Sequence, residues 1–134
     1  MSIRILLADD NCIFVSAVRQ FLERVPGTEV VARAHSGREA LAMAKLLSPD
    51  VALLDVSMPD MSGLDVAREM KTWPHSPHIV FLSMHDGAAY RSMARAIGAA
   101  GYVGKTDFVV DLLPMLENLV MGSATFVRAA RDRE

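Results

Sequence analysis

The fold of this chain is decided by the stretch Val51-Ala52-Leu53-Leu54-Asp55-Val56-Ser57-Met58-Pro59-Asp60-Met61-Ser62-Gly63. Four apolar residues run into an acid, and a loop with proline and glycine follows. A short apolar run bounded by turn residues is typical of a strand that is buried on both faces. Asp55 is therefore expected where this strand ends, and in open parallel sheets that carboxyl edge is where ligands bind.

The composition bounds the class of protein. A chain of 134 residues, of which 51% are hydrophobic and 22% charged, fits one globular domain with a real core. The formal net charge of −2 gives no sign of a nucleic-acid surface. No apolar run approaches the roughly 20 residues of a membrane span, and the single cysteine excludes an internal disulfide. These features favour a cytoplasmic protein.

The chain repeats a unit of strand followed by helix five times. Most of the helices show apolar residues at helical spacing, and the short apolar runs between them predict strands. The last helix is expected to begin late, near Val110 or Asp111, or to be locally distorted, because Pro114 fits poorly deep inside a helix. The predicted strands are 3–8, 29–34, 51–55, 78–83 and 101–104, and the predicted helices are 12–24, 36–47, 64–72, 88–97 and about 110–121.

This alternation predicts an α/β fold with a parallel sheet, helices on both faces and right-handed crossovers. The common five-stranded solution is the flavodoxin-like order 2-1-3-4-5, whose crevice lies between strands 1 and 3. That order places Asp9 and Asp10, which follow the first strand, beside Asp55. Ser83 and Lys105 lie at the ends of strands 4 and 5 on the same edge.

The residues gathered at this edge suit phosphoryl chemistry. Three carboxylates repel one another unless a cation neutralises them, and Mg²⁺ prefers a few carboxylates together with waters and phosphate oxygens. An aspartate can attack phosphorus, while a lysine and a hydroxyl can stabilise the phosphoryl oxygens. Each residue also has a simpler explanation, since an acid pair before a helix commonly caps it and a serine commonly bonds to local backbone. Their joint occurrence at the strand ends of one sheet favours a site.

The ordered set resembles the receiver domain of two-component response regulators, over about residues 3–120. The ending further resembles the receiver half of regulators that carry a LuxR-type helix-turn-helix. This implies a receiver at residues 1–121, a linker or tail at 122–134, and DNA contact only through an output domain that these residues lack. The motifs that carry the resemblance are the acid pair in residues 7–11, the phosphoacceptor signature in 54–63, the switch hydroxyl in 81–84 and the lysine in 101–105.

The resemblance implies a signalling switch in which a sensor histidine kinase phosphorylates Asp55. Asp10, Asp55 and the backbone carbonyl of Ser57 would bind Mg²⁺ directly, and Asp9 would act through a metal-bound water. The protein would assist its own phosphoryl transfer and hydrolysis without being an enzyme. A homodimer through the last helix-strand-helix face is a family expectation, and no membrane partner is expected.

The resemblance also assigns roles to three residues near the end of the sheet. Lys105 would pair with Asp55 and then with the phosphoryl group, Ser83 would bond a phosphoryl oxygen, and Tyr102 would rotate inward behind it. The family usually has a proline with a cis peptide bond after this lysine, whereas here Thr106 follows. The Lys105–Thr106 bond is therefore either trans, with a shifted lysine loop, or an uncommon non-proline cis bond.

Two other functions are open to the same residues. A Mg²⁺-dependent phosphatase or phosphotransferase with an aspartyl intermediate usually needs a second acid two residues after the nucleophile, where this chain has Ser57. A receiver-like module that acts only by binding proteins is the other alternative. The complete polar set argues against it, and the Thr106 departure keeps it open.

Overall fold

Five parallel strands form one sheet in the order β2-β1-β3-β4-β5 in the computed structural model, which describes residues 2–84 and 88–120. The predicted α/β class and strand order are confirmed. The strands are β1 (Ile3–Ala8), β2 (Thr28–Ala34), β3 (Val51–Asp55), β4 (His78–Ser83) and β5 (Gly101–Gly104).

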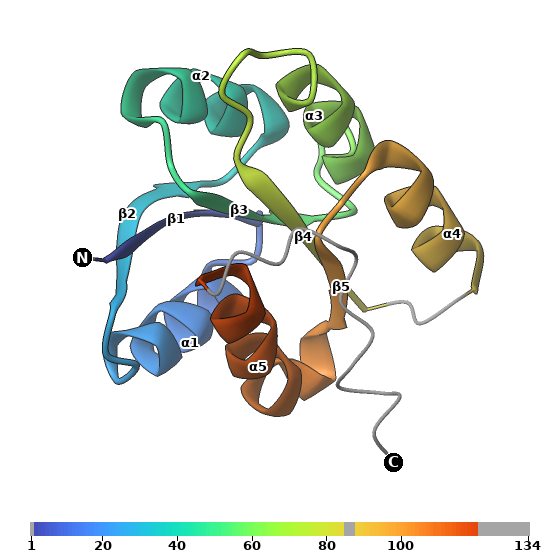
Figure 1. The fold of residues 1–134 in the computed structure, drawn as a ribbon. Helices are drawn as coiled ribbons and strands as arrows, with labels where there is room; N and C mark the ends of the chain where they lie inside the picture. The colour runs from blue at the N-terminus through green and yellow to red at the C-terminus, as the bar shows by residue number, and fades with distance from the viewer. Residues whose placement is uncertain (1, 85–87, 121–134) are drawn as a thin grey trace.

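Helices cover both faces of the sheet, as the alternation predicts. Figure 1 shows α1 and α5 on one face and α2, α3 and α4 on the other. A short 3₁₀ turn, η1 (Lys105–Asp107), connects β5 to the last helix. The helices are α1 (Cys12–Glu23), α2 (Gly37–Leu47), α3 (Gly63–Met70), α4 (Ala88–Ile97) and α5 (Phe108–Val120).

Strand β3 lies at the centre of the core, and all five of its residues are buried. Its side chains alternate between two apolar clusters because successive residues of a strand point to opposite faces. Ala52 and Leu54 pack in the cluster under α2 and α3, whereas Val51 and Leu53 pack in the cluster under α1 and α5. Burial on both faces explains why the strand is apolar at every position before Asp55.

Local sequence sets the helix ends. The Ser36 hydroxyl accepts a hydrogen bond from the Glu39 N–H at 3.1 Å and so caps the start of α2. The Glu39 carboxylate accepts in return from the N–H of His35, one residue before the cap, at 2.6 Å. At the other end of the domain, Gly98 follows α4 with φ of +92°, a left-handed conformation that favours glycine.

The last helix, expected to begin near Val110 or Asp111 or to be locally distorted, begins somewhat earlier, at Phe108, and contains Pro114. The proline removes the hydrogen bond to the carbonyl of Val110. Val110 is 67% exposed, so this side of the helix faces water, which can satisfy that carbonyl. On the opposite side Leu112 and Met115 are fully buried, and their packing stabilises the helix despite the proline.

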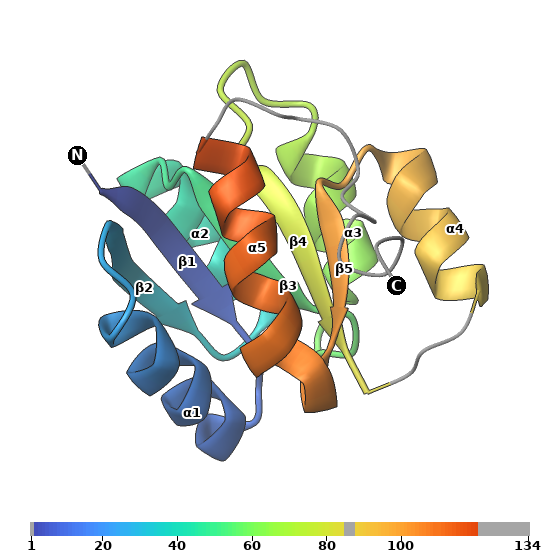
Figure 2. The ribbon, with the colours of Figure 1, turned by 60° about the horizontal axis from the view of Figure 1, so that its bottom comes forward.

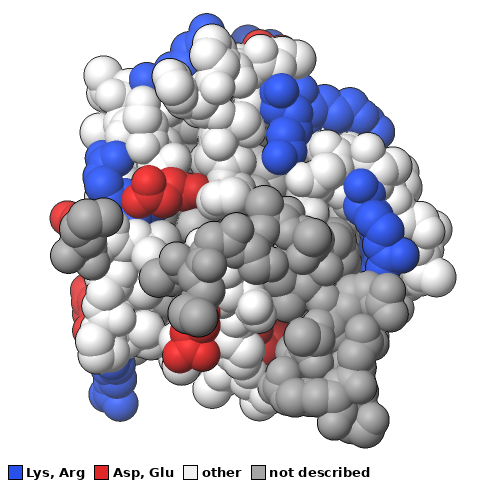
Figure 3. Space-filling model, viewed as in Figure 1, with Lys and Arg blue, Asp and Glu red and all other residues white. Residues whose placement is uncertain are grey.

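The described surface carries charges of both signs. On the face seen in Figure 3, basic and acidic side chains are interspersed among uncharged ones. Among residues 2–84 and 88–120, none of the helices combines the length and apolar character needed to cross a bilayer. The predicted boundary at 121/122 and the tail at 122–134 lie outside the described residues and stay a prediction.

Candidate functional site

The polar residues predicted to act together lie at the carboxyl ends of four neighbouring strands. Figure 2 shows these strand ends converging on the edge of the sheet where α1 and the turn before α5 begin. Asp9 directly follows β1 and Lys105 directly follows β5, so the register of the sheet brings them to Asp55 and Ser83. The pairs at this edge are Ala8 with Leu54, Asp55 with Leu82, and Ser83 with Gly104.

Three carboxylates form the centre of the site. One oxygen each from Asp9, Asp10 and Asp55 lies within 4.8 Å of the others. Asp9 is fully buried, Asp55 is 4% exposed, and Asp10 is exposed. The simpler explanation for the acid pair, capping of α1, does not hold, because Asn11 is the cap and accepts from the N–H groups of Ile13 and Phe14.

The environment of Asp55 favours its neutral form. Burial is the largest cause and the charge of Asp9 the second, and together they raise the pKa of Asp55 to about 6. The Lys105 ammonium and the Ser57 N–H, which donates to Asp55 Oδ1 at 3.3 Å, act in the opposite direction. A group with this pKa is still mostly a carboxylate at neutral pH, and a cation in the site would increase that fraction.

Lys105 reaches into the site although its peptide bond to Thr106 is trans. Of the two alternatives for this bond, the structure has the trans form. The Lys105 side chain is 10% exposed, and its Nζ lies 2.7 Å from Asp9 Oδ2 and 3.4 Å from Asp55 Oδ1. The resemblance implied a pair with Asp55, and the structure places the ammonium closer to Asp9.

The backbone around Asp55 leaves no room for a side chain at Gly63. A Cβ at this position would lie 2.2 Å from the carbonyl oxygen of Asp55. The Gly63 N–H donates to the carbonyl of Val56 at 2.9 Å, which folds the loop back onto the strand end. The glycine of the signature is thus needed for close backbone approach.

Ser83 lines the pocket, whereas Tyr102 belongs to the buried apolar core. Ser83 is 2% exposed and Tyr102 is fully buried, with the guanidinium carbon of Arg91 4.8 Å from the centre of its ring. Tyr102 is buried in this structure, and the inward rotation that the resemblance implied for it stays a prediction. A cavity of about 490 Å³ opens beside the acids and is lined by Asp10, Asn11, Asp55, Ser57, Ser83, Met84 and Lys105.

The loop that follows Asp55 contains a structural contact that the sequence did not reveal. Asp60 lies in this loop, and its two oxygens accept from the N–H groups of Gly37 and Arg38 at 2.8 and 2.9 Å. These hydrogen bonds hold the pKa of Asp60 below its usual value. No local pattern predicts a contact across 22 or 23 residues, so the signal is visible only in the fold.

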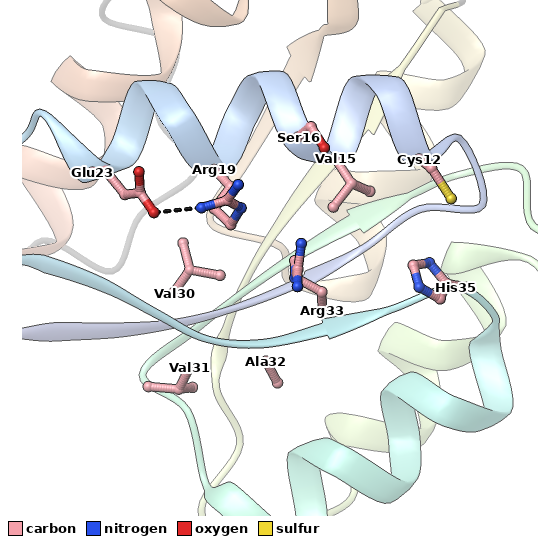
Figure 4. A pocket seen from close by; sticks show the side chains of 10 residues that line it. All are labelled: Cys12, Val15, Ser16, Arg19, Glu23, Val30, Val31, Ala32, Arg33 and His35. Carbon is pink, nitrogen blue, oxygen red and sulfur yellow. Dashed lines mark hydrogen bonds and ion pairs between the residues drawn. The ribbon is translucent and has the colours of Figure 1, made fainter.

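A larger cavity, of about 730 Å³, lies between α1 and the edge strand β2. Figure 4 shows Arg19 and Arg33 pointing into it from the two elements, with Arg19 paired to Glu23. The described residues that line it include no cluster of carboxylates comparable to the one at the sheet edge. The smaller cavity is therefore the candidate site because the reactive groups converge there.

The acidic cluster fits a hard divalent cation. Asp9 Oδ2 is buried and has no aligned hydrogen-bond donor among the described residues, although Lys105 lies close to it. Three carboxylates beside an open cavity match the oxygen ligands and retained waters that Mg²⁺ requires. The residues present are therefore suited to Mg²⁺, and its binding stays a prediction. His85, which follows Ser83 by two positions and could affect access to the pocket, lies outside the described residues.

Comparison with known proteins agrees with this geometry. A sequence model of the family described as response regulator receiver domain matches residues 5–117. The chain is similar to a two-component response regulator of the LuxR family from Aurantimonas sp. SI85-9A1, with a TM-score of 0.88, 30% identity, and 98% and 94% of the two chains covered. It is also similar to the receiver domain of NarL from Mycobacterium tuberculosis, with a TM-score of 0.85, 30% identity, and 91% and 98% covered.

Longer proteins contain regions similar to this chain. The nitrate/nitrite response regulator NarP of Escherichia coli is 34% identical over 92% of this chain and 57% of its own length. The transcriptional regulatory protein MctR of Rhizobium johnstonii is 30% identical over 97% and 61%. A protein-glutamate methylesterase/protein-glutamine glutaminase of Carboxydothermus hydrogenoformans is 40% identical over 82% and 31%. The chain thus spans between about a third and three fifths of these relatives.

Proposed function

Because this chain belongs to the response regulator receiver domain family, we propose that it is a phosphorylation-dependent switch whose phosphoacceptor is Asp55. A sensor histidine kinase is the proposed donor. The observation that carries the proposal is the position of Asp55, which is 4% exposed and shares the ammonium of Lys105 with Asp9. Its companions suit charge neutralisation around a phosphoryl group.

The proposed reaction is a transfer from phosphohistidine to aspartate. A carboxylate oxygen of Asp55 attacks phosphorus, an oxygen–phosphorus bond forms, and the phosphorus–nitrogen bond breaks with its electron pair going to the imidazole nitrogen. Lys105 would neutralise charge on the phosphoryl oxygens, and the Ser83 hydroxyl would donate a hydrogen bond to one of them. Hydrolysis of the acyl phosphate by water later restores the carboxylate.

Asp10, Asp55 and the backbone carbonyl of Ser57 are the proposed direct ligands of Mg²⁺, with Asp9 acting through a bound water. When bound, the ion supplies charge neutralisation for the carboxylates and the phosphoryl oxygens. Asp9 holds its place through its own hydrogen bond, since Oδ1 accepts from the Asn11 N–H at 2.9 Å. This contact orients the carboxylate whether or not an ion is present.

The phosphoryl group would bias a two-state element by its new contacts with Ser83 and Lys105, and Tyr102 would respond behind them. The similarity to LuxR-family regulators supports an output in transcription, with DNA bound by a domain outside these residues. A homodimer through α4, β5 and α5 and a cytoplasmic location complete the proposal. The relatives also include a protein-glutamate methylesterase/protein-glutamine glutaminase, so the comparisons support the phosphoacceptor role more strongly than the transcriptional output.

The test is phosphorylation by acetyl phosphate with Mg²⁺, followed by intact-mass measurement. One acid-labile phosphoryl group is expected on the wild type and none on Asp55→Asn, while Asp60→Asn, which changes a neighbouring carboxyl outside the pocket, should still be labelled. Equal labelling of Asp55→Asn would contradict the proposal. Sustained hydrolysis of phosphomonoesters would indicate a phosphatase instead, and a folded protein that binds neither Mg²⁺ nor a phosphoryl mimic would indicate a purely binding module.

A further inference from the structure

Three phenylalanines connect Lys105 to α1. The Nζ of Lys105 lies 4.8 Å from the centre of the Phe14 ring. The Phe14 ring meets Phe108 edge to face at 5.4 Å, and Phe108 meets Phe21 in the same way at 5.7 Å. Both geometries are attractive, because an ammonium is drawn to the face of an aromatic ring and ring edges are drawn to ring faces.

The backbone next to Lys105 provides little restraint on its side chain. The bond to Thr106 is trans, and Thr106 and Asp107 are exposed in a 3₁₀ turn that has no side-chain cap. A lysine has four rotatable bonds and loses conformational freedom when it is held in one place. Its position therefore depends on what its ammonium contacts.

The two carboxylates alone do not hold the Lys105 ammonium in a fixed position. The contact with Asp9 Oδ2, at 2.7 Å, is an ion pair without the alignment of a hydrogen bond. Phosphorylation would alter the charge on Asp55, the other partner. The Phe14 ring is different, because it belongs to α1 and keeps the same electrostatic character whatever happens to Asp55. Phe108, three residues after Lys105, anchors the lysine loop to that same ring.

We propose that Phe14 is a positioning residue that holds the Lys105 ammonium at the phosphoacceptor pocket, with Phe108 fixing the orientation of the Phe14 ring. This inference rests on the proposed function of Asp55. Phe14 touches no reacting atom and acts through Lys105. The aromatic contact takes the place of backbone restraint at a lysine whose following bond is trans.

The first experiment measures the rate of phosphorylation by acetyl phosphate with Mg²⁺. Its variants distinguish the effect of the Phe14 aromatic ring from the effect of the side-chain volume. Phe14→Leu and Phe14→Met keep apolar volume but remove the ring, so the rate constant should fall roughly threefold to tenfold. Phe14→Tyr keeps the ring and should retain the rate. Phe21→Leu is the matched control, because Phe21 belongs to the same aromatic chain without contacting Lys105, and its rate should be unchanged.

A double-mutant cycle separates positioning from a general structural effect. In a Lys105→Ala background, Phe14→Leu should cause little further loss of rate, since its effect passes through the lysine. The same fold-loss in both backgrounds would overturn the inference. Circular dichroism of each variant establishes that it folds. If Phe14→Leu does not fold, Phe14→Met replaces it in the cycle.

A spectroscopic measurement tests the contact without phosphorylation. The ε-methylene protons of Lys105 should show an upfield ring-current shift in the wild type and Phe21→Leu that disappears in Phe14→Leu. If the wild type is not labelled by acetyl phosphate, the proposed function of Asp55 fails, whereas the ring-current shift still tests whether Phe14 holds the lysine. A labelled wild type with an unchanged rate in Phe14→Leu and Phe14→Met overturns the positioning role alone.

Discussion

The two loops that carry Asp55 and Lys105 are held in place by different means. The loop at residues 56–62, after β3, is pinned by backbone hydrogen bonds, with the Val56 N–H donating to Leu82 at 3.0 Å and the Gly63 N–H returning to Val56 at 2.9 Å. Asp60 ties the same loop to α2. The turn at 105–107, after β5, is held instead by side-chain contacts of Lys105 with Asp9, Asp55 and Phe14.

The contrast between backbone hydrogen bonds and side-chain contacts agrees with the role proposed for Asp55 and for Lys105. A phosphoacceptor must present its carboxylate in one orientation, and a backbone network provides that without depending on charge. A lysine that exchanges one anionic partner for another must move slightly, which side-chain contacts allow. The comparison predicts that backbone changes damage the first loop and that charge or ring changes damage the second.

The largest effect should come from Gly63→Ala. Its Cβ would lie 2.2 Å from the Asp55 carbonyl oxygen, so the strand end must shift, and the free energy of unfolding should fall by about 3 kcal/mol in a urea titration. Gly104→Ala is the matched change beside the other loop. Its Cβ would meet Asp107 at an ordinary 3.5 Å, so stability should stay within about 0.5 kcal/mol of wild type. Equal losses would remove the distinction between the loops.

The next effect concerns the charge on Asp55 without metal. Because its pKa in the folded state is raised to about 6 from 3.8, the protonated form stabilises the fold. That contribution is complete below pH 3.8 and is lost as the pH rises through 6, so Asp55→Asn should remove this part of the pH dependence in metal-free urea titrations.

Asp9→Asn should lower the pKa of the Asp55 carboxyl, measured by carbon NMR, because the substitution removes a neighbouring negative charge. A higher pKa in Asp9→Asn would show that the hydrogen bonds around Asp55 had changed as well.

Removing the lysine should strengthen Mg²⁺ binding. Lys105 places a positive charge 2.7 Å from Asp9 and 3.4 Å from Asp55, where it repels a divalent cation. Lys105→Ala should therefore bind Mg²⁺ roughly tenfold more tightly in calorimetry at fixed ionic strength. Lys45→Ala controls for net charge, because in the wild type the Lys45 ammonium lies over Trp73. This variant should bind Mg²⁺ as the wild type does. Weaker binding by Lys105→Ala would mean that the lysine holds the acids in their ligand positions.

The smallest effect should come from Asp60→Ala, which removes the acceptor for the N–H groups of Gly37 and Arg38. The urea midpoint should fall modestly, because Ser36 still caps α2. Since the pKa of Asp60 is lowered in the folded state, its contribution is present above pH 3.8 and lost as the pH falls below it. The difference from wild type should therefore shrink in acid. Asp107→Ala, an exposed acid in the other loop, should leave the midpoint nearly unchanged.

Most of the architecture could be predicted because its signals are local. The local patterns placed all five helices within about two residues of their observed ends, and the alternation of strands and helices led to the strand order. The start of α5 was expected slightly too late, because the cost of Pro114 was weighed without the burial of Leu112 and Met115 that offsets it. The positions of the acids at strand ends also followed from local pattern combined with that order.

By itself, the sequence determined the parallel sheet and the edge at which Asp9, Asp10, Asp55, Ser83 and Lys105 meet, because strand periodicity and strand order are set by short-range patterns. Only the tertiary structure decided how these residues are held. The closer pairing of Lys105 with Asp9, the Phe14 ring beside its ammonium and the Asp60 cap on α2 join residues between 22 and 96 positions apart. Such contacts depend on side-chain packing between elements, which no local pattern encodes.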